Sequence, residues 1–165
     1  MQLDCAVEAP WPAAIGWEAL AGQVAAAVVQ EAPELANPRL CASILFADDE
    51  QVQALNREWR GKDKPTNVLS FPMLERAQLA ALCADGPPEL LGDIVLALET
   101  CAREAADKGI SLADHAAHLM AHGLLHLAGH DHETGTEDAE RMELLEIKAL
   151  ALLGIADPYS LFDNQ

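Results

Sequence analysis

Apolar residues recur at every second position, or form short runs between turn residues, in four segments of the chain. In the first segment, Leu3, Cys5 and Val7 occupy alternate positions. This pattern is typical of β-strands with one buried face, and short apolar runs bounded by turn residues are typical of buried strands. The four predicted strands cover residues 3–7, 40–47, 66–71 and 90–97.

Five longer segments carry apolar residues three or four positions apart, the spacing that places side chains on one face of a helix. Asp48, with Gln51 three residues later, forms a capping-box arrangement at one start, and Ser111 marks another. Glycines follow four of the segments, as they often do where helices end. The predicted helices cover residues 17–31, 49–60, 99–108, 112–128 and 136–153.

Two of these helices have faces that the spacing assigns in detail. Val52, Leu55 and Trp59 share a face, so we expect Trp59 to pack in the core rather than serve as a platform for a nucleic-acid base. The last helix, which Thr136 is expected to cap, has an apolar stripe that should face the core while its acids face water. The stripe consists of Met142, Leu145, Ala149 and Leu152.

Together these elements predict an α+β fold: a single domain over residues 1–165 with a four-stranded mixed β-sheet, packed with about five helices. The histidine-rich helix, residues 112–128, should be central. Residues 73–89, rich in glycine and proline at their end, should form a surface connection with at most a short helix. A length of 165 residues and 51% hydrophobic residues are enough for one sizeable core.

Composition indicates where in the cell the protein is expected and the redox state of its cysteines. No apolar run approaches the 18 or so residues of a membrane span, and the N-terminus lacks a basic-then-apolar signal pattern, so we expect a cytoplasmic protein. The four cysteines are scattered without metal-ligand spacing and should be reduced, partly buried thiols. They are Cys5, Cys41, Cys83 and Cys101.

The formal net charge of −17 argues against broad, non-specific binding of RNA or DNA, and we expect neither a membrane nor DNA as a partner. Residues 56–64 are an exception, because four basic and two acidic residues give this segment a charge of 4 − 2 = +2. Such a strip either holds a phosphate or is the solvated end of a helix, where cations favour the helix dipole. Its basic residues are Arg57, Arg60, Lys62 and Lys64.

All six histidines of the chain lie in residues 111–132. Because His122 and His126 are four apart on a helix, their rings point the same way and can reach one Zn²⁺. Gly129 provides a bend that returns the next residues towards the pair, and His132 is then the expected third ligand. Three nitrogen ligands with an open fourth position are typical of catalytic zinc.

The spacing of His122, His126, Gly129 and His132 resembles the metzincin protease pattern. Gly123 stands where those proteases have their glutamate base, which disfavours a peptidase. An alternative ligand pair, His118 with His122, has the same spacing.

Other polar residues near the predicted site have less definite roles. We expect His115 and His118 to pack in the core or to orient the ligands. His130 is a ligand, a proton shuttle or a surface residue. Asp93 shares a strand face with Leu91 and Val95, and it either orients the site or pairs with a backbone donor.

Three segments in the same order make the chain similar to the YbeY family of bacterial endoribonucleases, also called rRNA maturation factors. They read NREWRGKDKPTNVLSFP at residues 56–72, LGDI at residues 91–94 and HGLLHLAGHDH at residues 122–132. The resemblance extends from the first predicted strand to the last helix. Members of the family often carry Tyr at the position of His130 and Asp at that of Asn67.

The resemblance implies one Zn²⁺ per chain, bound by His122, His126 and His132, and an arginine, Arg60, that is needed for activity. It also implies cleavage of single-stranded RNA, with a role in 3′-end maturation of small-subunit (16S) rRNA and in ribosome quality control. The partners it implies are the ribosomal small subunit with its proteins and an Era-type GTPase.

The expected function is therefore that of a zinc-dependent, single-strand-specific endoribonuclease. We expect Arg60 and His122 to be catalytic, with Arg60 stabilising charge on the phosphoryl group, and Lys62 and Lys64 to bind phosphate. His130 or Asp131 would shuttle a proton. The alternatives are a metallohydrolase of another class, such as a metzincin-like peptidase or amidase, and a ribosome-associated factor with a structural zinc.

Overall fold

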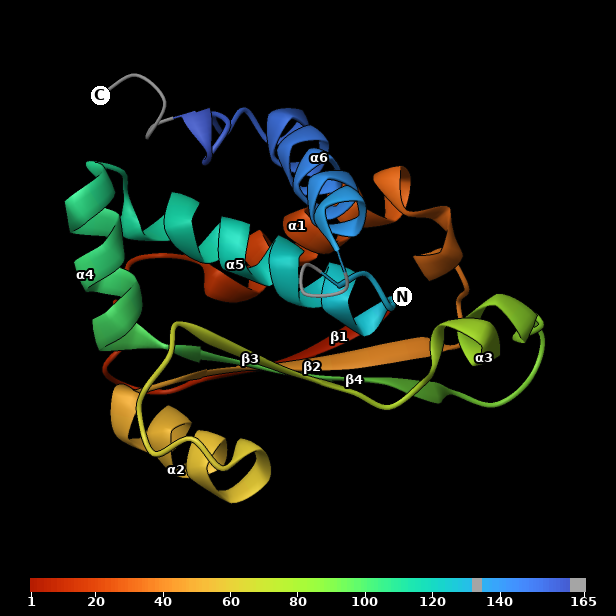
Figure 1. Ribbon diagram of the computed structural model, residues 1–165, viewed down its shortest axis with the longest axis horizontal. Helices are drawn as coiled ribbons and strands as arrows, with labels where there is room; N and C mark the ends of the chain where they lie inside the picture. The colour runs from red at the N-terminus through yellow and green to blue at the C-terminus, as the bar shows by residue number, and fades with distance from the viewer. Residues whose placement is uncertain (132–134, 161–165) are drawn as a thin grey trace.

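Four strands lie side by side in the order β1-β2-β4-β3 (Figure 1). In the computed structural model, which describes residues 1–131 and 135–160, β1, β2 and β4 are parallel and β3 is antiparallel to β4. The sheet is mixed, as predicted, and both ends of every strand lie within two residues of the predicted ends. The strands are β1 (Gln2–Val7), β2 (Leu40–Ala47), β3 (Val68–Pro72) and β4 (Glu89–Ala97).

Six α-helices occur in the described residues, and five of them match the predicted helices to within one residue. The sixth, α3, is a single short helix in the segment where at most a short helix was expected. Helix α6 starts at Thr136 with Gly135 as its cap residue, so Thr136 does not cap it. The helices are α1 (Trp17–Glu31), α2 (Asp49–Arg60), α3 (Arg76–Ala81), α4 (Leu98–Lys108), α5 (Leu112–Leu127) and α6 (Thr136–Leu152), with a 3₁₀ turn at Pro33–Leu35.

Helices cover both faces of the sheet (Figure 1). Helices α1 and α5 pack on one face, where most of the buried apolar residues form one continuous core, and α6 packs on α1 and α5. Helix α2 packs on the other face over a smaller cluster. Helix α5 contacts α1, α4, α6, β3 and β4. The prediction that the histidine-rich helix is central is confirmed.

A β-bulge in β4 changes the predicted faces of that strand. The pairing of β2 with β4 shifts so that Cys41 faces Leu90 and Ala42 faces Gly92, which leaves Leu91 as an extra residue. Leu91 therefore packs in the larger core, whereas Val95 packs in the cluster under α2. The prediction that Leu91, Asp93 and Val95 share one face is wrong, because strict alternation fails across a bulge.

Two glycines let α5 lie close to the sheet. A Cβ on Gly92, which has φ +154°, would lie 2.4 Å from the carbonyl oxygen of Phe71 and 2.6 Å from a methyl carbon of Leu127. A Cβ on Gly123 would lie 3.0–3.2 Å from three side-chain carbons of Ile94. Position 123 thus faces the sheet, and these contacts fix the height of α5 above β4.

Two predicted helix faces differ from the structure. Trp59 is 67% exposed, since only Val52 and Asn56 of α2 are buried and the contact with the sheet does not extend to the last turn. In α6, Leu152 is 48% exposed and Glu146 is fully buried, so the prediction that its acids face water is wrong for Glu146. Apolar spacing identifies a face but not how far along the helix that face is covered.

All four cysteines are free thiols, and Cys83 is exposed. Among the described residues, no helix is both long enough and apolar enough to cross a membrane.

We expect Gly92→Ala to lower the free energy of unfolding by about 2 kcal/mol or more, because the new methyl group meets the backbone of β3 at a strained φ. Urea denaturation measures this. The matched control is Gly22→Ala in α1, where a Cβ meets nothing within 4 Å and helix propensity should add up to about 1 kcal/mol. Equal effects at the two sites would contradict the close packing at Gly92.

Candidate functional site

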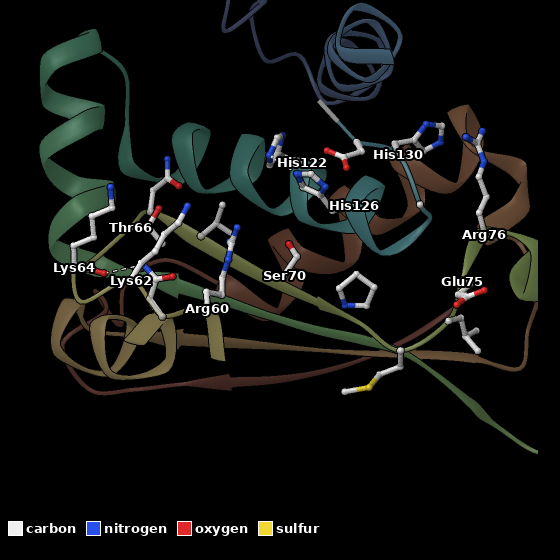
Figure 2. A pocket seen from close by; sticks show the side chains of 18 residues that line it. Arg60, Lys62, Lys64, Thr66, Ser70, Glu75, Arg76, His122, His126 and His130 are labelled. Atoms are coloured by element: carbon white, nitrogen blue, oxygen red, sulfur yellow. Dashed lines mark hydrogen bonds between the residues drawn. The ribbon is translucent and has the colours of Figure 1, made fainter. Parts of the chain in front are cut away.

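Helix α5 brings the imidazoles of His122 and His126 together. Its start is fixed by Ser111, whose hydroxyl accepts a hydrogen bond from the backbone N–H of Asp114 at 3.0 Å. One turn apart, the two rings meet edge to face, with centroids 4.5 Å apart and their Nε2 atoms 3.0 Å apart. Both side chains are half-buried and border the same cavity (Figure 2).

The geometry of this pair fits a shared metal ion. Two nitrogens on one tetrahedral Zn²⁺ with bonds of about 2.0–2.1 Å are roughly 3.3 Å apart, close to the 3.0 Å between the two Nε2 atoms. The expected third ligand, His132, lies outside the described residues. Within residues 1–131 and 135–160, no three His, Cys, Asp or Glu side chains are grouped to hold a metal. The three-histidine set therefore stays a prediction.

The bend predicted at Gly129 is present. Gly129 has φ +95°, and the N–H of His130 donates to the carbonyl of Leu125 at 3.0 Å, which ends α5 and turns the chain back. A Cβ on Gly129 would lie 2.9 Å from Cβ of Arg76, so the bend also packs against the start of α3. His130 and Asp131 are placed at the cavity by this turn.

The cavity has a volume of about 840 Å³ and a positive charge in an acidic protein. It lies between α5, β3, the segment after α2 and the start of α3 (Figure 2). Among the described residues, four of the ten Lys and Arg residues line it, against two acids, which gives this part of the lining a charge of 4 − 2 = +2. The cations are Arg60, Lys62, Lys64 and Arg76, and the acids are Glu75 and Asp131.

The basic strip after α2 reaches the cavity because of two local features. Gly61 adopts left-handed backbone geometry, φ 69°, and ends α2 as predicted. The buried amide of Asn56 then donates to the carbonyl of Lys64 at 2.9 Å, which ties the following segment to the helix. Arg57 does not line the cavity; it pairs with Asp63 at 3.5 Å on the exposed surface.

A buried carboxylate from α6 joins two of the histidines. Oε1 of Glu146 lies 3.0 Å from Nε2 of His118 and 3.0 Å from Nδ1 of His122, and Oε2 accepts a hydrogen bond from the hydroxyl of Tyr159 at 3.0 Å. Burial alone would raise the pKa of Glu146, but the hydrogen bonds from both histidines outweigh it and bring that pKa to about 2. Glu146 is therefore ionised at neutral pH.

The other two histidines of α5, His115 and His118, each lie against a carboxylate. His115 is buried, its Nε2 lies 2.9 Å from Oε1 of Glu104, and burial lowers its pKa. His118 has its Nε2 on Glu146, and the centroids of His118 and His122 are 6.5 Å apart. The structure thus brings His122 together with His126 and not with His118.

The other predicted site residues are more dispersed. His130 is buried at the rim of the cavity, and its Nε2 lies 3.0 Å from Oε1 of Glu34. Asp131 lines the cavity. Asp93 is not among the described lining residues, and its carboxylate accepts a short hydrogen bond from the hydroxyl of Ser43 rather than from the backbone.

Two residues of the site were not found from the sequence. Arg76 lies in a segment predicted to be a surface connection, and only the packing of α3 against the Gly129 bend brings it to the cavity. Glu146 stands four residues after Met142 on the predicted apolar stripe. An acid at that core position was the available signal.

Comparison with known proteins identifies a family over most of the chain. Residues 14–154 match the family described as "Endoribonuclease YbeY". The endoribonuclease YbeY of Erythrobacter litoralis is 62% identical over 159 residues, which cover 96% of this chain and 98% of that protein. The endoribonuclease YbeY of Novosphingobium aromaticivorans is 56% identical over 162 residues, which cover 98% and 97% of the two chains.

A solved structure shares the fold. The solution structure of TM1509 from Thermotoga maritima superposes with a TM-score of 0.57 at 20% identity, over 92% of this chain and 91% of that one. The likeness to this solved structure also confirms the predicted α+β fold class.

We expect Asn56→Ala to lower the free energy of unfolding by about 1–2 kcal/mol, because it removes a buried hydrogen bond to the backbone of Lys64. The exposed neighbour Trp59→Ala is the control and should change it by less than about 0.5 kcal/mol. Chemical denaturation measures both. A larger loss at Trp59 than at Asn56 would show that Trp59 packs in a core after all.

Proposed function

The chain belongs to the endoribonuclease YbeY family and is an RNA-cleaving hydrolase, and we propose that it cuts RNA in the cavity beside His122 and His126. One observation carries the proposal: two convergent imidazole nitrogens border a positive cavity in a protein of net charge −17. RNA phosphates would be attracted there and repelled by most of the remaining surface.

We propose that the histidines bind one Zn²⁺ per chain, with His132 as the third ligand. The facing Nε2 atoms of His122 and His126 support this assignment, since imidazole is a common zinc ligand. When bound, such an ion supplies Lewis-acid polarisation of a phosphoryl oxygen and a lowered pKa for a coordinating water.

Basic residues on two sides of the histidine pair would bind the RNA backbone. Figure 2 shows Arg60, Lys62 and Lys64 on one side of the pair and Arg76 on the other. We propose that the planar guanidinium of Arg60 binds the phosphate being cleaved and stabilises the charge that develops on it. Lys62, Lys64 and Arg76 would hold the neighbouring phosphates.

We propose that Asp131 or His130 carries the proton in the reaction, because both residues border the cavity. Nε2 of His130 also lies 3.0 Å from Oε1 of Glu34. A carboxylate at the position of Asp131 can accept a proton from an attacking hydroxyl and return it to the leaving oxygen.

The substrate we propose is single-stranded rRNA precursor, and residues 1–165 would act as one metallohydrolase domain in the cytoplasm. Only four Lys or Arg line the cavity, so partner proteins on the ribosomal small subunit, or an Era-type GTPase, would deliver the RNA. Tight and weakly salt-dependent binding of unfolded RNA by the isolated protein would contradict this delivery.

The decisive experiment is cleavage of a defined single-stranded rRNA fragment by purified protein, with and without a chelator. We expect cleavage that the chelator stops and added Zn²⁺ restores. A 2′,3′-cyclic phosphate on the products identifies the ribose hydroxyl as nucleophile, and a 5′-phosphate identifies water. Zinc-loaded protein that cuts nothing but sediments with ribosomal subunits would instead indicate a structural zinc.

Two variants separate metal binding from phosphate binding. Arg60→Ala should keep its zinc and fold but lose about 10²–10³ in cleavage rate, whereas His126→Ala should lose zinc. Elemental analysis and a single-turnover assay measure the two effects. Arg57→Ala, outside the cavity, is the control and should cut normally. Wild-type turnover by Arg60→Ala would remove Arg60 from the mechanism.

A further inference from the structure

We infer that Glu146 is a positioning residue for the His122–His126 pair: its carboxylate selects which nitrogen of His122 carries the proton and holds Nε2 towards His126. The inference rests on the proposed function in one respect, namely that the pair binds zinc.

The location of Glu146 is unusual for a carboxylate. Its exposed fraction is 0%, and it stands on the buried stripe of α6 with Met142, Ala149 and Leu150. Burying an ionised group is costly unless hydrogen-bond donors replace the lost water. An apolar side chain would serve packing better at this position, so the residue is better explained by what its oxygens bind.

All the contacts described for Glu146 are with donors of the histidine network. Oε1 lies 3.0 Å from Nε2 of His118 and 3.0 Å from Nδ1 of His122, while Oε2 accepts from the hydroxyl of Tyr159 at 3.0 Å. Oε1 meets two ring nitrogens at once and Oε2 is already bound by a hydroxyl, which is the arrangement of a carboxylate that accepts at both oxygens. It therefore has no proton to donate, and both imidazoles must donate to it.

This requirement determines the tautomer of His122. A neutral imidazole carries one N–H, so a proton on Nδ1 for Glu146 leaves Nε2 unprotonated, as an acceptor. Nε2 is the atom that faces His126 at 3.0 Å. A metal ligand needs an unprotonated nitrogen, and metal-bound histidines commonly donate their other N–H to a carboxylate in this way.

Glu146 is itself held from two further directions. His118 gives only its Nε2–H, because its Nδ1 is buried without a hydrogen-bond partner in the described part of the chain. Tyr159, from the segment after α6, binds the other oxygen and stacks edge to face on His118 at 5.4 Å between centroids. The carboxylate therefore has little freedom to turn away from His122.

The first test is the protonation of His122 in metal-free protein, read from long-range ¹H–¹⁵N couplings by NMR. We expect the proton on Nδ1 in the wild type and a measurable Nε2–H population in Glu146→Gln, which keeps the size of the side chain and removes its charge. A wild-type His122 with its proton on Nε2 would overturn the inference without the need for any variant.

The second test is zinc affinity, measured by competition with a chelator. Glu146→Gln should bind Zn²⁺ about 10–100-fold more weakly than the wild type. Glu140→Gln makes the same chemical change at an exposed site on the same helix and should bind as the wild type does. Tyr159→Phe keeps the carboxylate and its charge, so it should retain the Nδ1–H tautomer and lose less affinity than Glu146→Gln.

Thermal unfolding of the metal-free variants separates positioning from a merely structural role. If Glu146→Gln loses stability but keeps the wild-type tautomer and zinc affinity, Glu146 only supports packing and the inference fails. Should Glu146→Gln not fold, the tautomers of the wild type and Tyr159→Phe decide. A wild type that shows the Nδ1–H tautomer but neither binds zinc nor cuts RNA would refute the proposed function and leave the tautomer assignment standing.

Discussion

The structure depends on the burial of α5 between the sheet and the other helices. Eleven of its sixteen residues are buried, and Gly92 and Gly123 allow it to approach β4 closely. A helix buried on nearly all sides has no water to satisfy its polar side chains, so each imidazole needs a protein partner. Glu104 provides one for His115, and Glu146 provides one for His118 and His122. The chemistry of the site is therefore coupled to the packing of α6.

The same packing distinguishes this site from the protease pattern that its histidines resemble. The spacing of His122, His126 and Gly129 is shared, but the position between the two histidines that holds the base in metzincins faces Ile94 here. A side chain at Gly123 would have to displace that of Ile94. The spacing of the histidines is thus retained, while the polar residues that line the cavity beside them come from α2, the following segment and the Gly129 bend.

The distribution of charge distinguishes the cavity from the rest of the surface. A net charge of −17 repels polyanions over most of the surface, while the described lining of the cavity has four cations, on two sides of the histidine pair, and two acids. Partly enclosed charges of one sign focus the local potential more strongly than the same charges spread over a surface. The positive potential is therefore concentrated beside His122 and His126 rather than spread over a broad surface.

The sequence by itself determined the strands, five of the six described α-helices, the facing histidine pair and the bend at Gly129, because periodicity and glycine stops are local properties of the chain. The three motifs also indicated the family. The tertiary structure alone decided the bulge at Leu91, the exposure of Trp59 and the arrival of Arg76 at the cavity. It also decided that Oε1 of Glu146, 24 residues beyond His122, lies 3.0 Å from Nδ1 of His122. Each of these depends on which distant segments pack together. The spacing of residues along one helix or strand does not determine that packing.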